Sequence, residues 1–340
     1  MLFVLSMIIM TCERRPLEYD EILPTAKFDV KIDWSKSGIE PYAEDKGVHR
    51  VSFRFFPKDK QPIFERYLEG NVTEGQIEVT LGKYSVIVYN ESIDDRNYWD
   101  EAITFTDVNS YDNFAANAVP YNAALRAQEF PFYKPLSGEQ FIVDPLQLAS
   151  WSIADFEVTE NMVLVMKGAR PSSSLTDEEA EMVNAFHNVV LRALTRPVKF
   201  TARIENMVSA QETYMVMRGF ANKVYMASGK TTNNPVSYLF TLGGRKFDTG
   251  GKHGTMTANF RSFGRIPVSS SESYLTAADV LFGTGELYKP PKPLQFDVTN
   301  QVLQNYNTKV NIDLSIQYNL PFVEGGISVD DWEDDTYILE

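Results

Sequence analysis

The chain has 340 residues, a hydrophobic content of 44%, an aromatic content of 13% and a formal net charge of −14. This length fits roughly two domains of about 150 residues, and the composition excludes a chain that is disordered throughout. The negative charge argues against nucleic acid as a partner, because phosphates demand a basic protein face. Much of that charge lies in residues 324–340, which contain acidic residues but no lysine or arginine.

The chain begins with an apolar run, Leu2 to Met10, that stops close to Cys12, the only cysteine. The run is shorter than the ~18 residues of a membrane-spanning helix and is typical of a signal peptide. Bacterial lipoproteins are cut just before a cysteine that then takes acyl chains such as palmitate. Residues 9–12 resemble such a cleavage site imperfectly, with no basic residue ahead of the run. We therefore expect a signal peptide over residues 1–11 and lipidation of Cys12. An ordinary signal peptide with an incidental cysteine is the alternative.

Period-two alternation dominates the rest of the chain. Apolar side chains in residues 27–34 alternate with charged ones, as a half-buried strand requires; they are Phe28, Val30, Ile32 and Trp34. Residues 76–90 predict a hairpin that turns at Gly82, and residues 310–318 alternate most regularly. Further strands are predicted at 50–56, 162–166, 198–205, 213–218, 223–227, 236–242, 255–261 and 294–299. Many short strands separated by turn residues predict an all-β chain built from β-sandwiches.

One segment breaks this pattern. Residues 176–179 form a capping-box sequence, and apolar residues at helical spacing follow it, so a helix is predicted over residues 176–194. The flexible composition just before it places a domain boundary near residue 170. We therefore expect a tether over 12–26, an N-terminal sandwich domain over 27–170, and a C-terminal sandwich domain over 171–340 that starts with a helical linker and ends with an acidic tail.

Catalytic and metal-binding patterns are scarce. The three histidines lie far apart with no cysteine beside them, so no zinc site is predicted, and His187 is expected on the surface of the predicted helix. Residues 229–231 lack the earlier glycine of a phosphate-binding loop. Residues 330–335 favour a solvated terminus over an irregular calcium site, and the glycine-rich stretch 243–254 favours a mobile hairpin over an anion site. We expect a protein that is not an enzyme and needs no cofactor or metal; a catalytic site built from scattered carboxylates is the rival hypothesis.

Residues 98–133 contain nine aromatic side chains. A long connection between strands must bury something to be ordered, so a core or covering loop is the favoured interpretation. Aromatic faces also stack on sugars, and a glycan platform that includes Trp99 and Tyr111 is the second interpretation. A protein contact is the third.

Four stretches resemble a known family. They are residues 12–17, 77–90, 200–207 and 325–333. The first resembles the mature start of lipoproteins from anaerobic Gram-negative bacteria. The other three are similar to elements of fimbrillin-like proteins: a strand–glycine–tyrosine–strand–asparagine element, the opening strand of the second domain, and the C-terminal signature.

The resemblance implies two transthyretin-like sandwich domains and a role as a shaft, tip or anchor subunit of surface pili. In shaft subunits of the family, loss of the first strand opens a groove that a neighbour's terminal strand fills by β-strand addition. The candidate first strand here contains Phe28, Val30, Ile32 and Trp34, and the candidate end strand or donor contains Ile327, Val329 and Trp332. For residues 27–34 an ordinary strand in the chain's own sheet is favoured, which suits an anchor.

We therefore expect a lipid-anchored outer-membrane protein at the cell surface. It would serve as an anchor or accessory subunit in pilus assembly or adhesion, with pilin subunits as partners through β-strand addition. The alternative is a surface lipoprotein that binds glycan or a host ligand through residues 98–133. Anchor, tip and free-standing lipoprotein all stay open from the sequence.

Overall fold

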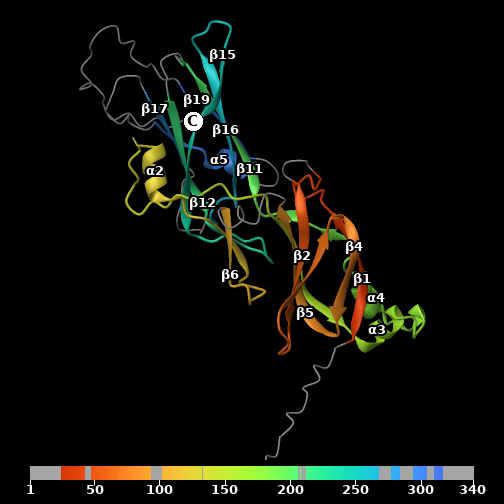
Figure 1. Cartoon of the computed structure of the whole chain (residues 1–340). Helices are drawn as coiled ribbons and strands as arrows, with labels where there is room; N and C mark the ends of the chain where they lie inside the picture. The colour runs from red at the N-terminus through yellow and green to blue at the C-terminus, as the bar shows by residue number, and fades with distance from the viewer. Residues whose placement is uncertain are drawn as a thin grey trace, which may run out of the picture.

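The strands of the protein form two lobes joined by a small central sheet (Figure 1). The structure is a computed structural model. It describes residues 24–42, 47–92, 102–131, 133–205, 207, 212–267, 277–283, 294–304 and 310–316. Within these ranges, no helix is long and apolar enough to cross a membrane.

Two sheets face each other in the first lobe. One has the order β4-β1-β9 and contains β1 (Thr25–Asp33), β4 (Glu74–Thr80) and β9 (Val189–Val190). The other has the order β10-β8-β5-β2-β3 and contains β2 (Val48–Pro57), β3 (Phe64–Glu69), β5 (Gly82–Ser92), β8 (Ala149–Val158) and β10 (Arg192–Ala193). Helices α3 (Glu160–Met166) and α4 (Asp177–Val183), joined through the short helix η1 (Ser172–Ser174), lie at one end of this lobe beside β1 (Figure 1).

The core between these two sheets is built around aromatic rings. Phe28 of β1, Phe53 of β2 and Phe156 of β8 are buried, and each ring contacts the ring of Phe186 at a centroid distance of 5.8, 5.7 and 4.9 Å, respectively. Full burial of one such side chain stabilises a fold by roughly 1.5–3 kcal/mol. The alternation predicted for residues 27–34 is confirmed, because every second side chain of β1 faces this core.

The second lobe also contains two sheets. One has the order β15-β16-β11-β19 and contains β11 (Arg196–Ile204), β15 (Gly243–Phe247), β16 (Gly254–Ser262) and β19 (Val310–Ile316). The other has the order β14-β12-β17-β18 and contains β12 (Glu212–Ala221), β14 (Pro235–Thr241), β17 (Ala277–Gly283) and β18 (Leu294–Asp297). Helix α5 (Thr299–Gln304) packs on β19. The regular alternation of β19 is confirmed over its described residues.

The central sheet connects early and late parts of the chain. It contains β6 (Ile103–Thr106), β7 (Ala115–Ala118) and β13 (Lys223–Tyr225), and β7 pairs with β13. One apolar cluster runs from the second lobe through this sheet to Phe56 and Ile87 of the first lobe. The two lobes therefore share a core, and the division of the chain into two tandem domains near residue 170 stays a prediction.

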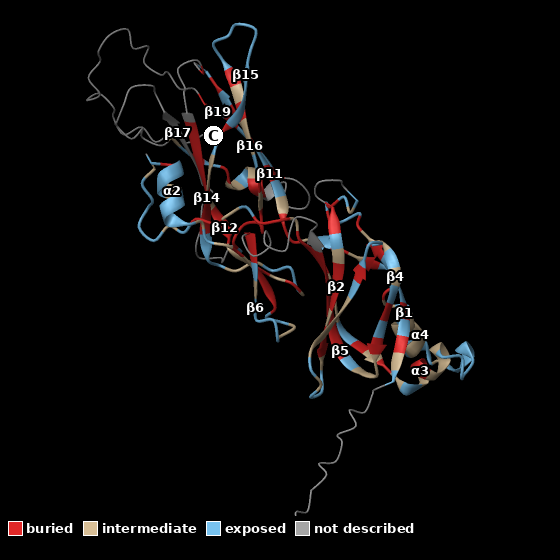
Figure 2. Cartoon of the chain, in the orientation of Figure 1, coloured by how far each residue is buried: buried red, intermediate tan, exposed pale blue. Residues whose placement is uncertain are grey.

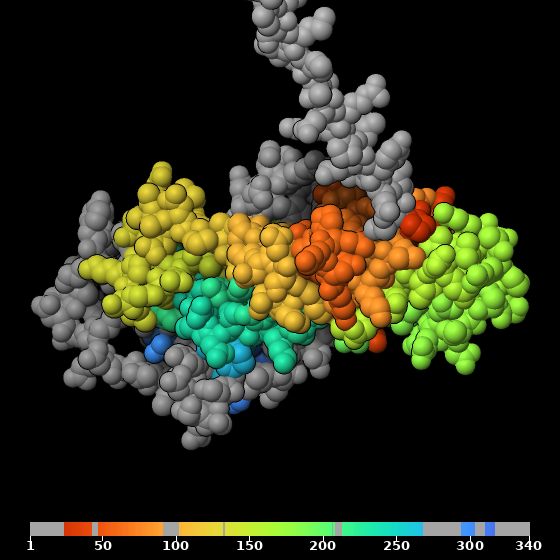
Figure 3. Space-filling view, turned by 90° about the horizontal axis from the view of Figure 1, so that it is seen from below, coloured from red at the N-terminus to blue at the C-terminus, as the bar shows by residue number. Residues whose placement is uncertain are grey.

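A covering segment, residues 121–143, packs on the outer face of β12 and β14. It includes α2 (Ala123–Glu129), which buries none of its side chains, whereas β12 beneath is largely buried (Figure 2). Viewed from below, it lies on the side of the molecule opposite the helices of the first lobe (Figure 3). Its Phe130 and Phe141 pack against Tyr214 and Val216 on the outer face of β12. The residues that alternate with these two along β12 face the core of the second lobe.

One buried carboxylate fastens the covering segment. Glu139, with 5% of its side chain exposed, accepts from Arg218 Nε at 2.7 Å, from the Tyr133 hydroxyl at 2.7 Å and from the Ser237 hydroxyl at 2.9 Å. Burial alone would raise the pKa of Glu139, but these donors and the Leu136 N–H outweigh it and hold the pKa below its ordinary value.

The hairpin predicted at Gly82 is wrong. Strand β4 pairs with β1, whereas β5 pairs with β2 and β8, so the chain crosses from one sheet to the other at this point. The buried Tyr84 holds the crossing, because its hydroxyl lies 3.0 Å from the Thr80 carbonyl oxygen and 3.2 Å from that of Leu81. Gly82 has a φ of 151°, and a Cβ there would lie 2.8 Å from the Tyr84 hydroxyl oxygen. Only glycine fits this position without displacing the tyrosine.

The strand predicted at residues 162–166 is also wrong, because these residues lie in helix α3. The Thr159 hydroxyl accepts the Met162 N–H at 3.1 Å and caps the helix. A short apolar run does not by itself distinguish a strand from a buried helical turn.

The predicted helix over residues 176–194 begins as expected and ends early. Thr176 caps α4 through a capping box, but the helix stops at Val183. The chain then turns, and Phe186 enters the aromatic core. His187 therefore lies outside the helix, on the surface, with Nε2 4.0 Å from Asp29 Oδ2.

We predict that Tyr84→Phe lowers the free energy of unfolding by about 1–3 kcal/mol, because the Thr80 and Leu81 carbonyl oxygens lose the one hydroxyl proton that lies within reach of both. Urea unfolding measures this change. The matched control is Tyr42→Phe, which removes a hydroxyl from a side chain that is 59% exposed and should change stability by less than about 0.5 kcal/mol. Equal effects of the two substitutions would contradict a role for Tyr84 in the crossing.

We predict that Glu139→Gln lowers stability at pH 7 by roughly 1–3 kcal/mol, because the charged partner of Arg218 is lost. A lowered folded pKa contributes stability that is present above the unfolded pKa and is lost as pH falls through the folded pKa. The difference between wild type and variant should therefore shrink below about pH 4.5.

Urea unfolding between pH 7 and pH 3.5 tests this expectation. The exposed Glu40 offers the control substitution Glu40→Gln, for which stability should follow the wild type at every pH. If the difference in the free energy of unfolding between Glu139→Gln and wild type stayed constant down to pH 3.5, the expectation would be contradicted.

Candidate functional site

The residues predicted for the first strand lie where an ordinary strand would place them. Phe28, Val30 and Ile32 are buried on β1, and Trp34 follows the strand and donates from Nε1 to the Val72 carbonyl oxygen at 3.2 Å. β1 lies between β4 and β9, so it is an internal strand of the chain's own sheet. The role of these residues in strand exchange stays a prediction.

The other predicted site residues are mostly outside the described ranges. They are Cys12, Trp99, Ile327, Val329 and Trp332. Tyr111 is described, and its ring packs edge-on to Phe56 at 5.8 Å. Phe105 and Phe114 pack in the shared core, so the described aromatic residues here serve mainly as core and covering groups. The glycan platform with Trp99 and Tyr111 stays a prediction.

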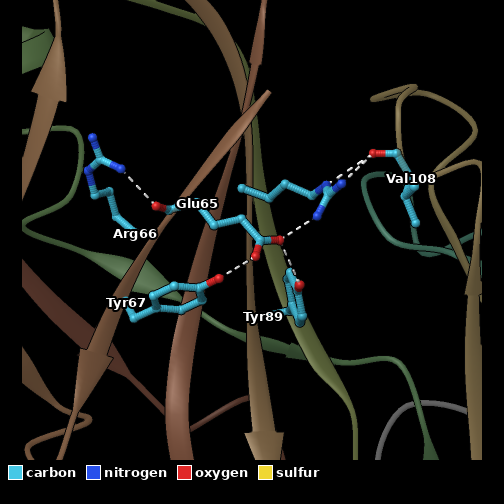
Figure 4. Close-up of polar contacts among 6 residues, drawn as sticks. Glu65, Arg66, Tyr67, Tyr89 and Val108 are labelled. Atoms are coloured by element: carbon cyan, nitrogen blue, oxygen red, sulfur yellow. Dashed lines mark hydrogen bonds and ion pairs between the residues drawn. The ribbon is translucent and has the colours of Figure 1, made fainter. Parts of the chain in front are cut away.

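Sequence reasoning missed a polar cluster on β2, β3 and β5. The Glu65 carboxylate accepts hydrogen bonds from the Tyr67 hydroxyl, from the Tyr89 hydroxyl at 3.2 Å and from Arg54 Nη1 (Figure 4). Arg54 also donates from Nε and Nη2 to the Val108 carbonyl oxygen, at 3.0 and 2.8 Å. Arg54 therefore ties the first lobe to the turn between β6 and β7.

Alternation along β2 placed Arg54 on the solvent side, but the structure buries most of it. Its side chain is 16% exposed and that of Glu65 is 21% exposed. Its guanidinium carbon also lies 5.3 Å from the centre of the Phe114 ring, within range of a cation–π contact. The sequence did contain a signal for this cluster. Arg54 on one strand lies opposite Glu65 on the next, and cross-strand pairs of opposite charge attract each other.

A pocket of about 400 Å³ opens beside this cluster. Its walls come from β2, from β3 with the residues before it, and from the β6–β7 turn. The lining residues are Arg54, Ile63, Phe64, Glu65, Tyr67 and Asn109. In the part of the chain that the structure describes, no three histidine, cysteine or acidic residues are grouped so that they could hold a metal ion. The pocket thus offers hydrogen bonding and an aromatic surface for binding.

An open sheet edge is the second candidate feature, because strand addition requires one. Among the described strands, β19 has a neighbour only on its β11 side. On the other side, the Gln301 side chain of α5 accepts from the Asp313 N–H at 2.8 Å and donates to the Asp313 carbonyl oxygen at 3.1 Å. One amide side chain thus occupies the middle of this edge as a neighbouring strand would.

The family of the chain follows from comparison with known sequences. Residues 11–241 match the model of a family described as a domain of unknown function, DUF5119. The chain belongs to the DUF5119 family. This match includes the whole first lobe, the Arg54 cluster and the Gly82 crossing. Comparison with curated proteins gives no match.

Solved structures show what the fold of this DUF5119 chain is similar to. A candidate adhesin from Bacteroides ovatus has 16% sequence identity, and the match covers 92% of this chain and 100% of that one with a TM-score of 0.52. A second candidate adhesin from Bacteroides ovatus has 11% identity, coverage of 87% and 90%, and a TM-score of 0.48. The fimbrial anchor protein Mfa2 from Porphyromonas gingivalis has 13% identity, coverage of 86% and 90%, and a TM-score of 0.43. The first match confirms the all-β fold that the fimbrillin-like resemblance implied.

We predict that Arg54→Met lowers the free energy of unfolding by about 1–3 kcal/mol, because the partly buried Glu65 carboxylate loses its charged partner and the Val108 carbonyl oxygen loses two donors. Hydrogen exchange in the β6–β7 turn should also become faster. Urea unfolding and exchange mass spectrometry measure both. Lys58→Met is the control, because it removes an ion pair with Asp155 on the surface, where such pairs contribute about 0–1 kcal/mol. If hydrogen exchange in the turn were unchanged in Arg54→Met, the claim that Arg54 fixes the turn would be contradicted.

Proposed function

We propose that this chain is a lipid-anchored subunit of a surface adhesion structure, an anchor or accessory component of a pilus. The observation that carries the proposal is the fold, which this chain shares along nearly its whole length with a candidate adhesin. Its likeness to the fimbrial anchor Mfa2 suggests which role to test first.

The internal position of β1 supports an anchor over a shaft subunit. Removing β1 would take Phe28 out of the aromatic core and leave β4 without its antiparallel partner. Large-to-small changes at such positions cost about 3–5 kcal/mol for a single ring. A subunit that keeps this strand keeps the β1–β4 pairing of its first lobe and can remain at one end of an assembly.

The edge of β19 is the feature through which we expect a partner strand to bind. A pilin strand laid along β19 would gain main-chain hydrogen bonds, and pockets for alternate side chains would give specificity. Gln301 would have to leave Asp313 for the central bonds to form. In this proposal Ile327, Val329 and Trp332 belong to the chain's own terminal strand or to a donor strand.

A lipid on Cys12 would keep the first lobe close to the membrane. Residues 13–24 separate Cys12 from β1, and a chain of that length spans at most about 40 Å when fully extended. More than one acyl chain is needed for stable anchoring, which the modification of a lipoprotein cysteine supplies.

We predict that Cys12→Ser, expressed in the native host, abolishes metabolic labelling with palmitate and moves the protein out of the membrane fraction. Thr11→Ala keeps the thiol and should keep the label, which makes it the matched control. Labelling that survives Cys12→Ser would exclude this cysteine as the lipidation site.

Deletion of the gene tests the assembly role. We expect surface pili of altered length, or pili that detach into the medium, with restoration by the wild-type gene. Electron microscopy of cells and of shed material measures both properties. Pili unchanged in length and attachment would contradict the pilus proposal.

A further inference from the structure

The pocket beside Arg54 is an open surface hollow that is large enough to take a small ligand. Its volume of about 400 Å³ lies in the range of roughly 300–1,000 Å³ that is usual for ligand pockets. Three separate chain segments meet there: β2, residues 63–67, and the β6–β7 turn with Asn109. Arg54 fixes the turn against the strands through Val108 (Figure 4), so the pocket is already formed in the free protein.

Among the described residues, the ion pairs at and near the pocket each join a cation to a carboxylate. Arg54 is paired with Glu65 inside it, and Arg50 with Glu69 and Lys223 with Asp107 lie nearby. An anion or a cation would have to compete with an existing partner, at a cost in free energy. A neutral ligand avoids this cost and can still form hydrogen bonds with the charged groups.

Hydrogen-bonding capacity remains in the pocket walls. A guanidinium has five N–H donors, and the bonds described here use three of them in Arg54. A carboxylate has about four acceptor positions, and Glu65 uses three. Asn109 is exposed and adds an amide that both donates and accepts. A ligand rich in hydroxyl groups could use all three side chains.

An aromatic surface completes the pocket. Tyr67 is 40% exposed, and its ring is held on one side by the Arg50 guanidinium, whose carbon lies 4.4 Å from the ring centre. The Tyr67 hydroxyl is fixed by Glu65. A ring that is both exposed and held in place loses little conformational freedom when something stacks on it.

We propose that this pocket binds a neutral sugar residue of a glycan, with the apolar face of the sugar against Tyr67 and its hydroxyl groups bonded to Arg54, Glu65 and Asn109. Sugar rings combine a face of C–H groups with an equator of hydroxyl groups, and the pocket offers a matching aromatic surface and matching polar groups. The residues that line this pocket include neither Trp99 nor Tyr111. The proposal stands independently of whether the chain is a pilus subunit.

The test uses the purified full-length chain on an array that carries neutral and sialylated oligosaccharides. We expect binding to neutral oligosaccharides, and the strongest of these is then titrated by calorimetry. Tyr67→Ala and Asn109→Ala should each weaken that affinity at least tenfold. Asn109 is exposed on a turn, so Asn109→Ala should keep the fold. A loss of affinity in this variant would therefore not be caused by unfolding. Tyr42→Ala changes an exposed tyrosine outside the lining of this pocket and should bind as the wild type does.

Three outcomes would overturn the proposal: no neutral oligosaccharide bound, binding confined to sialylated oligosaccharides, or neutral binding that Tyr67→Ala and Asn109→Ala leave unchanged. Each concerns only the pocket. Lipid labelling at Cys12 and the pilus phenotype of the deletion strain would be unaffected, so failure here is distinguishable from failure of the proposed function.

Discussion

Burial of β5, the central strand of the sheet β10-β8-β5-β2-β3, on both faces is the constraint on which the rest of the structure depends. Along β5, Val86 and Val88 face the aromatic core of the first lobe, while Ile87 and Tyr89 face the core that continues into the second lobe. A strand that is apolar on both sides needs a layer on each. The central sheet supplies the second layer, and its β7 strand pairs with β13 from much later in the chain.

Polar contacts reinforce the same junction. The Ser150 hydroxyl of β8 donates to the Met226 carbonyl oxygen at 2.7 Å, and the buried Asn90 donates to the Gln147 carbonyl oxygen and accepts the Ala149 N–H. Arg54 also reinforces this junction, because it joins β2 to the β6–β7 turn. The pocket follows from this arrangement, because Arg54 of β2 bonds the β6–β7 turn at Val108, and Asn109 of that turn lines the pocket together with residues of β3.

The sequence predicted the strands whose environment is uniform along their length. β1 and β19 each have one buried and one exposed face, and their alternation was sufficient. β5 was recognised as a strand, yet its second buried face could not be inferred, because that depends on which sheet covers it. The capping box located the start of α4 but not its end, which is set by the entry of Phe186 into a distant core.

The candidate site was less accessible to sequence reasoning. Arg54, Glu65 and Asn109 are separated along the chain and meet only because β2 pairs with β3 and the β6–β7 turn folds over them. The structure gives a physical reason for the glycine, the tyrosine and the asparagine of the fimbrillin-like element. Gly82 leaves room for the Tyr84 hydroxyl, and Asn90 bonds the chain beside β8.

We propose that this protein is a membrane-held adhesion subunit that keeps its first strand. Mass spectrometry of the mature N-terminus, on protein purified from its native membrane, tests this most directly. We expect a chain that begins at an acylated Cys12 and retains β1. A mature chain that begins beyond Trp34 would contradict it, because such a chain has lost the strand at the centre of its first sheet.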